Sequence, residues 1–204
     1  LSGVATDVVA RCGGAEFREA ALFTHKGLSG PAILQVSSYW QPGADIGIDF
    51  LPERADDWLV AQKRTHPRSA PRTVLAQALP ARLADALGAR LDVGGELANT
   101  PDRTLQEMQR RLRDWRFRPS GTEGFAKAEV AAGGIDTAEL SSQTMQAKRV
   151  PGLYAIGEAV DVTGWLGGDT LQGAWASGWP AVPALCARAV RERPARLRAP
   201  LVTC

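Results

Sequence analysis

The sequence predicts a mixed α/β fold in which strands open the chain, helices occupy its centre and both kinds of element close it. Paired glycines between two short apolar runs near the N-terminus are typical of a β-hairpin. Amphipathic helical spacing dominates residues 52–114. Residues 151–179 combine an apolar run, a glycine-rich loop and a new helical pattern, which is typical of a ligand-binding edge in α/β proteins.

The N-terminal quarter has a strand pattern interrupted by one helix. Residues 6–10 and 16–23 flank Gly13-Gly14 and predict the two strands of the hairpin. After a loop over 24–30, Pro31 suits the first position of a helix over 31–40, with Ser29 or Gly30 near its cap. Residues 44–51 alternate and predict another strand, with Ile46, Ile48 and Phe50 on one face.

The centre and the C-terminal part alternate between helical and extended patterns. Early acids and late bases predict a helix over 53–64, followed by a Pro/Arg/Ser linker over 65–72. Pro80 interrupts a helical pattern over 73–91, and Thr100-Pro101-Asp102 caps the next helix over 104–115. The remaining predicted elements are strands from Trp115, over 125–134 and over 153–156, and a last helix over 170–189.

Composition narrows the class of protein. The chain has 204 residues, an apolar fraction of 45% and a net charge of +2, which allow a sizeable core but do not themselves indicate a nucleic-acid partner. The excess of arginine over lysine is explained by a GC-rich genome. Cys12, Cys186 and Cys204 show no CxxC spacing, which argues against a zinc site or a disulfide framework and predicts a cytoplasmic protein. We expect no membrane span and no signal peptide.

The segment around residue 158 carries the most chemical information. Leu153–Ile156 predicts a buried strand that ends at Gly157-Glu158, and ligands of α/β sheets bind at such carboxyl ends. The Glu158 carboxylate would accept hydrogen bonds from hydroxyl groups of a cofactor. Asp161 is a second candidate, although aspartate is also an ordinary turn residue.

The next loop leads into a helix N-terminus suited to a planar, partly anionic cofactor. Glycines allow close backbone approach, and the amides of Thr170 and Leu171 would be first-turn donors for an electron-rich carbonyl such as the pyrimidine edge of a flavin. The alternative is a plain helix capped by Asp169 or Thr170. The candidate cofactor-binding residues here are Gly164, Gly167, Gly168, Asp169, Thr170, Leu171 and Gln172.

Two further sites are predicted outside this loop. Gly133-Gly134 would let a ring lie against backbone, unless it is a bulge or a hairpin turn. His25 is the candidate proton donor to a substrate, unless it is a loop histidine bonded to backbone. The sequence has no Ser-His-Asp signature, no HExxH, no Walker A motif and no GxGxxG.

Three segments together resemble a known family. Residues 22–40 (LFTHKGLSGPAILQVSSYW), 128–136 (AEVAAGGID) and 150–178 (VPGLYAIGEAVDVTGWLGGDTLQGAWASG) are similar to the BaiN/RdsA family of bacterial NAD(P)/FAD-dependent oxidoreductases, also called aminoacetone-oxidase-like. The resemblance implies FAD as cofactor and possible use of NAD(P)H as electron donor. It places Gly157 and Glu158 at the ribityl–phosphate region, residues 167–172 at the flavin pyrimidine and Gly133-Gly134 against the isoalloxazine.

The resemblance also implies an arrangement of domains. A glutathione-reductase-type FAD domain, formed by two chain segments, is interrupted by a β-rich and a small helical domain. Residues 1–51 and 115–125 would belong to the β-rich domain and 52–114 to the helical one. Residues 126–189 would return to the FAD domain, and 190–204 would be a flexible basic tail. The family's dinucleotide-binding βαβ has no counterpart in this sequence, so we expect an N-terminal FAD-binding segment as partner.

Three functions follow from these expectations. The first is hydride transfer between a nicotinamide cofactor or an unknown small substrate and flavin. The second is reduction of uridine in ribosomal RNA, with phosphate contacts from the tail and from Arg110, Arg111, Arg113, Arg116 and Arg118; the near-neutral charge of the chain disfavours an extended RNA contact. The third is a non-catalytic binding or structural module.

Overall fold

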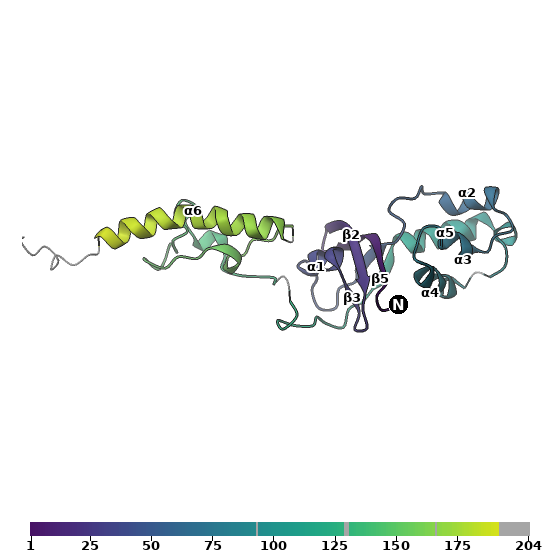
Figure 1. Cartoon of the computed structure of the whole chain (residues 1–204), viewed down its shortest axis with the longest axis horizontal. Coiled ribbons are helices and arrows are strands. Elements are labelled where there is room, and N and C mark those ends of the chain that lie inside the picture. Colours follow the sequence, from purple (N-terminus) through teal and green to yellow (C-terminus); the bar gives the residue numbers. More distant parts are fainter. Residues whose placement is uncertain (93, 129–130, 166, 192–204) are drawn as a thin grey trace, which may run out of the picture. The chain divides into compact units, whose positions relative to one another are not determined.

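The computed structural model describes residues 1–92, 94–128, 131–165 and 167–191, which divide into two compact units. The first unit spans Leu1–Ala131 and the second begins at Ala132 (Figure 1). The tail from residue 192 lies outside the described residues, as do residues 129–130 of the predicted strand over 125–134.

The first unit contains an antiparallel sheet in the order β3-β2-β1-β4-β5. The β1–β2 hairpin is confirmed, because Ala5 pairs with Leu22 and Cys12 with Ala15 on either side of Gly13-Gly14. Strand β4 pairs with both β1 and β5. The bounds of the strands are β1 Ala5–Cys12, β2 Ala15–Phe23, β3 Leu28–Ser29, β4 Ile46–Asp49 and β5 Trp115–Phe117.

One short helix packs against this sheet. Helix α1 (Pro31–Ser37) begins at the predicted proline and follows Gly30. Its apolar residues Ala32 and Val36 are fully buried and join the core formed by strands β1 and β2. The helix ends three residues earlier than predicted, and residues 38–40 form a turn closed by Ser38, Tyr39 and Trp40 amides.

The other helices of the first unit lie between β4 and β5 in the sequence and form a small cluster (Figure 1). Pro80 separates two of them, as predicted. Buried leucines of all these helices and the aromatic residues of the sheet belong to one apolar core. The elements are α2 Trp58–Thr65, α3 Pro71–Leu75, α4 Ala81–Leu91, the 3-10 turn η1 Leu97–Asn99 and α5 Asp102–Arg113.

A buried glutamine joins two of these helices. Gln109 of α5 is 2% exposed; its Oε1 accepts a hydrogen bond from the Leu59 amide at 2.9 Å, and its Nε2 donates to the Ala55 carbonyl. These bonds satisfy backbone groups at the start of α2. The predicted start of this helix at residue 53 is wrong. Helix α2 begins at Trp58, because residues 52–57 form turns.

The second unit consists mainly of loops beside one long helix. Helix α6 (Gly168–Arg191) continues through Pro180 and Pro183, and the loops contain the short turns η2 (Thr137–Glu139) and η3 (Gly157–Ala159). Leu140, Ala155 and Val160 form a small apolar core. No helix among the described residues has both the length and the apolar content needed to cross a bilayer.

The predicted buried strand over 153–156 is wrong. Tyr154 makes one isolated bridge with Gln146, and about half of the surface of Leu153 and of Ile156 is exposed. A strand needs a continuous run of pairs with at least one neighbour, and this segment has a single isolated bridge. The predicted strand over 125–134 is likewise wrong where residues are described, because 125–127 form a turn.

Candidate functional site

The two candidate segments around residues 134 and 160 lie against each other. The Ile135 amide donates to the Ala159 carbonyl at 2.8 Å, and the Asp161 amide donates to the Ile135 carbonyl at 2.9 Å. Ile135 and Val160 form a parallel bridge. Gly134 is required at this crossing, since a Cβ placed on it would lie 2.9 Å from the Asp161 nitrogen. The structure therefore brings Gly134 and Asp161 together.

The Gly157-Glu158 pair adjoins the middle of α6. The Gly157 amide donates to the Ser177 hydroxyl at 2.8 Å, and a Cβ on Gly157 would lie 3.7 Å from that of Ala174. Ala174 is about 9 Å along the axis from the start of the helix at Gly168. Gly157, next to the exposed Glu158, therefore contacts the second and third turns of the helix and not the first turn, which holds other candidate cofactor-binding residues.

The loop before helix α6 is held together by hydrogen bonds between Trp165 and Asp169. The Trp165 amide donates to the Asp169 carboxylate at 2.8 Å, and the Asp169 amide donates to the Trp165 carbonyl at 3.0 Å. Gly167 adopts a φ of +79°, a conformation that favours glycine. Asp169 thus holds the shape of the loop. Gly164 lies against the Asp169 side chain, and Gly168, Leu171 and Gln172 are exposed, with Thr170 half-buried.

His25 lies in the first unit. It is exposed in the loop between β2 and β3, whose ends are joined by a bond from the Thr24 amide to the Gly27 carbonyl at 2.7 Å. Within the described part of the chain no hydrogen bond to His25 is found, so the alternative of a histidine tied to backbone is not supported. Its role as a proton donor remains a prediction.

The residues of the second unit suit the ring end of a flavin. At Gly134 two backbone segments approach closely, and Gly167 opens the loop before a helix N-terminus, where the dipole favours electron-rich groups. Val162, Trp165 and Leu171, in the segment that precedes and begins α6, have exposed apolar side chains. The cofactor roles of the candidate residues remain predictions on this basis.

Helix α6 has two chemically different faces. Small residues, among them Ala174 and Ser177, face η3 and allow close approach. At 100° per residue, large apolar side chains fall on another face about 120° wide. These side chains are exposed by 45% to 84%, and they are Leu171, Trp175, Trp179, Val182 and Leu185. We call them the α6 apolar face. In the second unit itself nothing described covers it.

Four of the five arginines predicted to contact phosphate in residues 110–118 are paired with carboxylates, and the predicted contacts from the tail lie outside the described residues. Arg110 pairs with Glu107, Arg113 with Asp56, Arg116 with Asp114 and Arg118 with Asp45, while Arg111 lies over the Trp115 ring. The hydrogen bond from Arg118 lowers the pKa of Asp45, and that from Arg110 lowers the pKa of Glu107. These carboxylates offset the positive charge, so α5 and β5 do not form a basic strip.

Sequence reasoning missed two kinds of residue. Ser177 was hidden because a serine in a small-residue helix gives no signal of its partner twenty positions away. The carboxylates opposite the arginines were missed for the same reason, since Asp45 and Arg118 are 73 positions apart. Among the described residues, no group of three or more His, Cys, Asp or Glu side chains is placed to hold a metal ion.

Comparison with known proteins places these observations in a family. Residues 1–130 match the family described as HI0933-like protein barrel and H2TH domain. A ribosomal RNA dihydrouridine synthase of Escherichia coli strain K12 is 48% identical over 189 residues, and one of Haemophilus influenzae is 42% identical over 183 residues. Each match covers 88% of this chain, and 46% and 45% of the respective relative.

A third relative is more distant. A 3-dehydro-bile acid delta(4,6)-reductase of Clostridium scindens is 32% identical over 186 residues, which cover 84% of this chain and 44% of the relative. The chain thus spans about half the length of these proteins. All three are named as enzymes, and the third is named as a reductase, which agrees with the predicted enzymatic role at a coarse level. The chain belongs to the HI0933-like family, of which it carries the barrel and H2TH region.

Proposed function

We propose that this chain is the C-terminal part of a flavin-dependent oxidoreductase that reduces uridine to dihydrouridine in ribosomal RNA. The similarity to the Escherichia coli dihydrouridine synthase carries this proposal, because its 189 residues exceed the length of the first unit and so include candidate residues of the second. A ribosomal RNA substrate would also agree with the predicted cytoplasmic location.

The reaction adds a hydride and a proton across the C5–C6 double bond of uridine, and NAD(P)H supplies the two electrons and becomes NAD(P)⁺. A bound flavin would carry the electrons between the nicotinamide and the base. In this chain, the backbone at Gly134 and Asp161 would position the ring edge, and the helix start at Gly168 would stabilise charge that grows on a ring carbonyl. His25 is the candidate proton donor.

The remaining half of the site would come from the part of the full-length protein that corresponds to the rest of the relatives. We propose that this part, an FAD-binding segment of glutathione-reductase type, packs on the α6 apolar face. An exposed stripe of two tryptophans, two leucines and a valine is larger than soluble proteins usually leave open. Covering such side chains removes apolar surface from water, which favours association.

The test uses the full-length protein that contains this chain. It should purify with bound flavin and convert uridine to dihydrouridine in ribosomal RNA from a strain that lacks the enzyme, measured by mass spectrometry of nucleosides with NADH or NADPH. The His25→Asn variant should keep the flavin but lose about 100-fold or more in turnover. Flavin reduction without any dihydrouridine would support an oxidoreductase of another substrate, and a colourless, inactive protein would overturn the proposal.

A further inference from the structure

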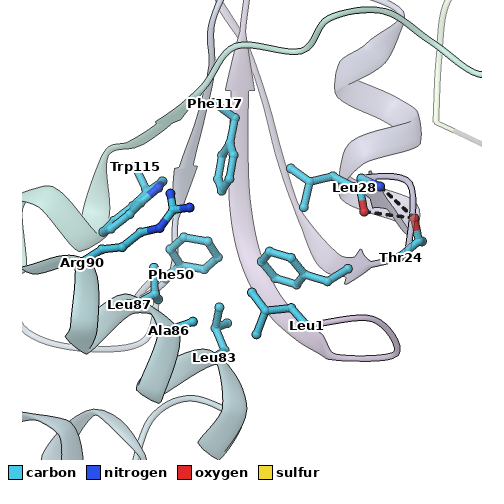
Figure 2. A pocket seen from close by; sticks show the side chains of 12 residues that line it. Leu1, Thr24, Leu28, Phe50, Leu83, Ala86, Leu87, Arg90, Trp115 and Phe117 are labelled. Atoms are coloured by element: carbon cyan, nitrogen blue, oxygen red, sulfur yellow. Dashed lines mark hydrogen bonds between the residues drawn. The ribbon is translucent and has the colours of Figure 1, made fainter.

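A half-open pocket of about 450 Å³ lies in the first unit, and its lining includes Thr24 and Gly27, on either side of the loop that carries His25. It opens between the sheet and helix α4 (Figure 2). Phe23 and Phe50 form part of its wall from the sheet, Trp115 and Phe117 add aromatic surface from β5, and Leu83 and Leu87 come from α4. This volume is within the range of sites for small organic ligands.

The wall of the pocket is almost wholly apolar. Phe50 is 2% exposed; its ring stacks on that of Phe23 with centroids 6.3 Å apart and meets the edges of Trp115 and Phe117 at 6.4 Å each. The hydroxyl of Thr24 is already used, because it donates to the Gly27 carbonyl and accepts from the Gly27 amide, both at 3.1 Å. A ligand with many polar groups would therefore lose hydrogen bonds on entry.

One charged side chain lines this wall. Arg90, near the end of α4, extends toward Trp115 and Phe117 (Figure 2). Within the described ranges no carboxylate pairs with Arg90, whereas Arg118 and Arg116 of the neighbouring strand segment are neutralised by Asp45 and Asp114. A single unpaired guanidinium beside an apolar pocket complements one negative charge on an otherwise apolar molecule.

We propose that this pocket binds a small amphipathic monoanion, with an apolar or aromatic body against the half-buried Leu28, Trp115 and Phe117 and one carboxylate on Arg90. The body would displace water from apolar surface, and the carboxylate would accept hydrogen bonds from the guanidinium at the mouth, where Arg90 itself is exposed.

An RNA segment fits these observations less well. Binding to a polyanion draws on several cations at once, and the arginines around β5 are already paired with carboxylates. A base could stack on the ring of Trp115, but Arg111 covers one face of that ring at 5.9 Å. Charge therefore favours a small molecule with one negative group.

The test compares two ligands of the same shape, 2-naphthoate and the neutral 2-naphthamide, by isothermal titration calorimetry on the full chain. We expect 2-naphthoate to bind about tenfold more tightly. Arg90→Gln should remove this preference, while Arg103→Gln, which removes an exposed arginine of α5 away from the pocket, should keep it. Ala86→Phe, which adds a ring within the pocket wall, should weaken both ligands.

Each other outcome counts against the proposal. Absence of binding by both ligands, or an unchanged preference in Arg90→Gln, would overturn it. Competition by uridine 5′-monophosphate that matches or exceeds that by 2-naphthoate would show a nucleotide site instead. If circular dichroism shows a lower melting temperature for Ala86→Phe, the comparison of Arg90→Gln with Arg103→Gln still tests the role of Arg90. Both of these positions are exposed, so neither change should unfold the chain. The assay contains neither flavin nor RNA, so binding of 2-naphthoate is measured separately from the reduction of uridine.

Discussion

The amide of Gly157 donates a hydrogen bond to the hydroxyl of Ser177, 2.8 Å away and twenty positions later in the chain. The same hydroxyl donates to the Gly173 carbonyl at 2.6 Å, so one serine side chain joins the η3 turn to the backbone of α6. Because Gly157 precedes Glu158, this bond sets the position of a candidate cofactor-binding acid relative to the helix.

Replacing Ser177 tests that connection. Ser177→Ala leaves the Gly157 amide without its acceptor, and we expect a loss of about 1 kcal/mol in the stability of the second unit. Hydrogen exchange measured by NMR should show faster exchange of the Gly157 amide. Ala176→Ser, an exposed neighbour on α6, serves as control and should leave that amide unchanged. Equal protection in Ser177→Ala and the parent chain would contradict the role assigned to this bond.

The close approach of residues 134–135 to residues 159–161 leads to a prediction about flavin binding. In Gly134→Ala the added Cβ would lie 2.9 Å from the Asp161 nitrogen and 3.0 Å from the Ala159 oxygen, so the two segments must separate. We expect the full-length protein to lose most of its bound flavin, measured by the ratio of absorbance at 450 nm to 280 nm as purified. Gly178→Ala, where a Cβ meets nothing within 4 Å, should retain it. Flavin loss in both variants, or in neither, would argue against this crossing as part of the site.

The α6 apolar face should govern the behaviour of the isolated chain. Trp175 is 80% exposed, and its replacement by serine removes a large part of the stripe without touching the small-residue face. We expect Trp175→Ser to raise the monomer fraction of this chain in size-exclusion chromatography with light scattering. In the full-length protein the same change should weaken flavin retention, because the tryptophan would be buried there. Unchanged flavin retention in the full-length Trp175→Ser variant would mean that nothing packs on Trp175.

The buried Asp49 should make the free energy of unfolding of the first unit depend on pH. The side chain is 5% exposed on β4, and burial raises its pKa although the Leu51 amide donates to Oδ1 at 2.7 Å. A raised pKa in the folded state means that the protonated carboxyl stabilises the fold. This contribution is present below the unfolded pKa and is lost as the pH rises through the folded pKa. Asp49→Asn keeps an acceptor for Leu51, so it should be more stable than the parent at pH 7.

Urea unfolding at pH 7 and at pH 3 would measure this difference, which should shrink toward zero at the lower pH. Asp45→Asn serves as a control, because the pKa of Asp45 is shifted in the opposite direction from that of Asp49. The hydrogen bond from Arg118 lowers the pKa of Asp45, so its contribution is present above the unfolded pKa and lost on acidification. The Asp45→Asn variant should therefore be slightly less stable than the parent at pH 7. A destabilised Asp49→Asn at pH 7 would refute the burial argument.

Local sequence determined the elements whose signals are complete within a few residues. Gly13-Gly14 supplied both turn positions of the β1–β2 hairpin, Pro31 began α1, and Pro80 separated α3 from α4. These residues act through their own backbone conformations, so no distant partner is needed. The segments that resemble the BaiN/RdsA family likewise predict an oxidoreductase from the sequence alone.

Only the tertiary structure decided which distant groups meet. Leu153–Ile156 has a strand composition but finds one short bridge, because a strand exists only where neighbours pair with it. Arg118, predicted to contact phosphate, instead forms an ion pair with Asp45. The Asp161 amide donates a hydrogen bond to the Ile135 carbonyl, 26 positions earlier in the chain. Such contacts depend on how the elements pack, whereas the turns depend on the residues that form them.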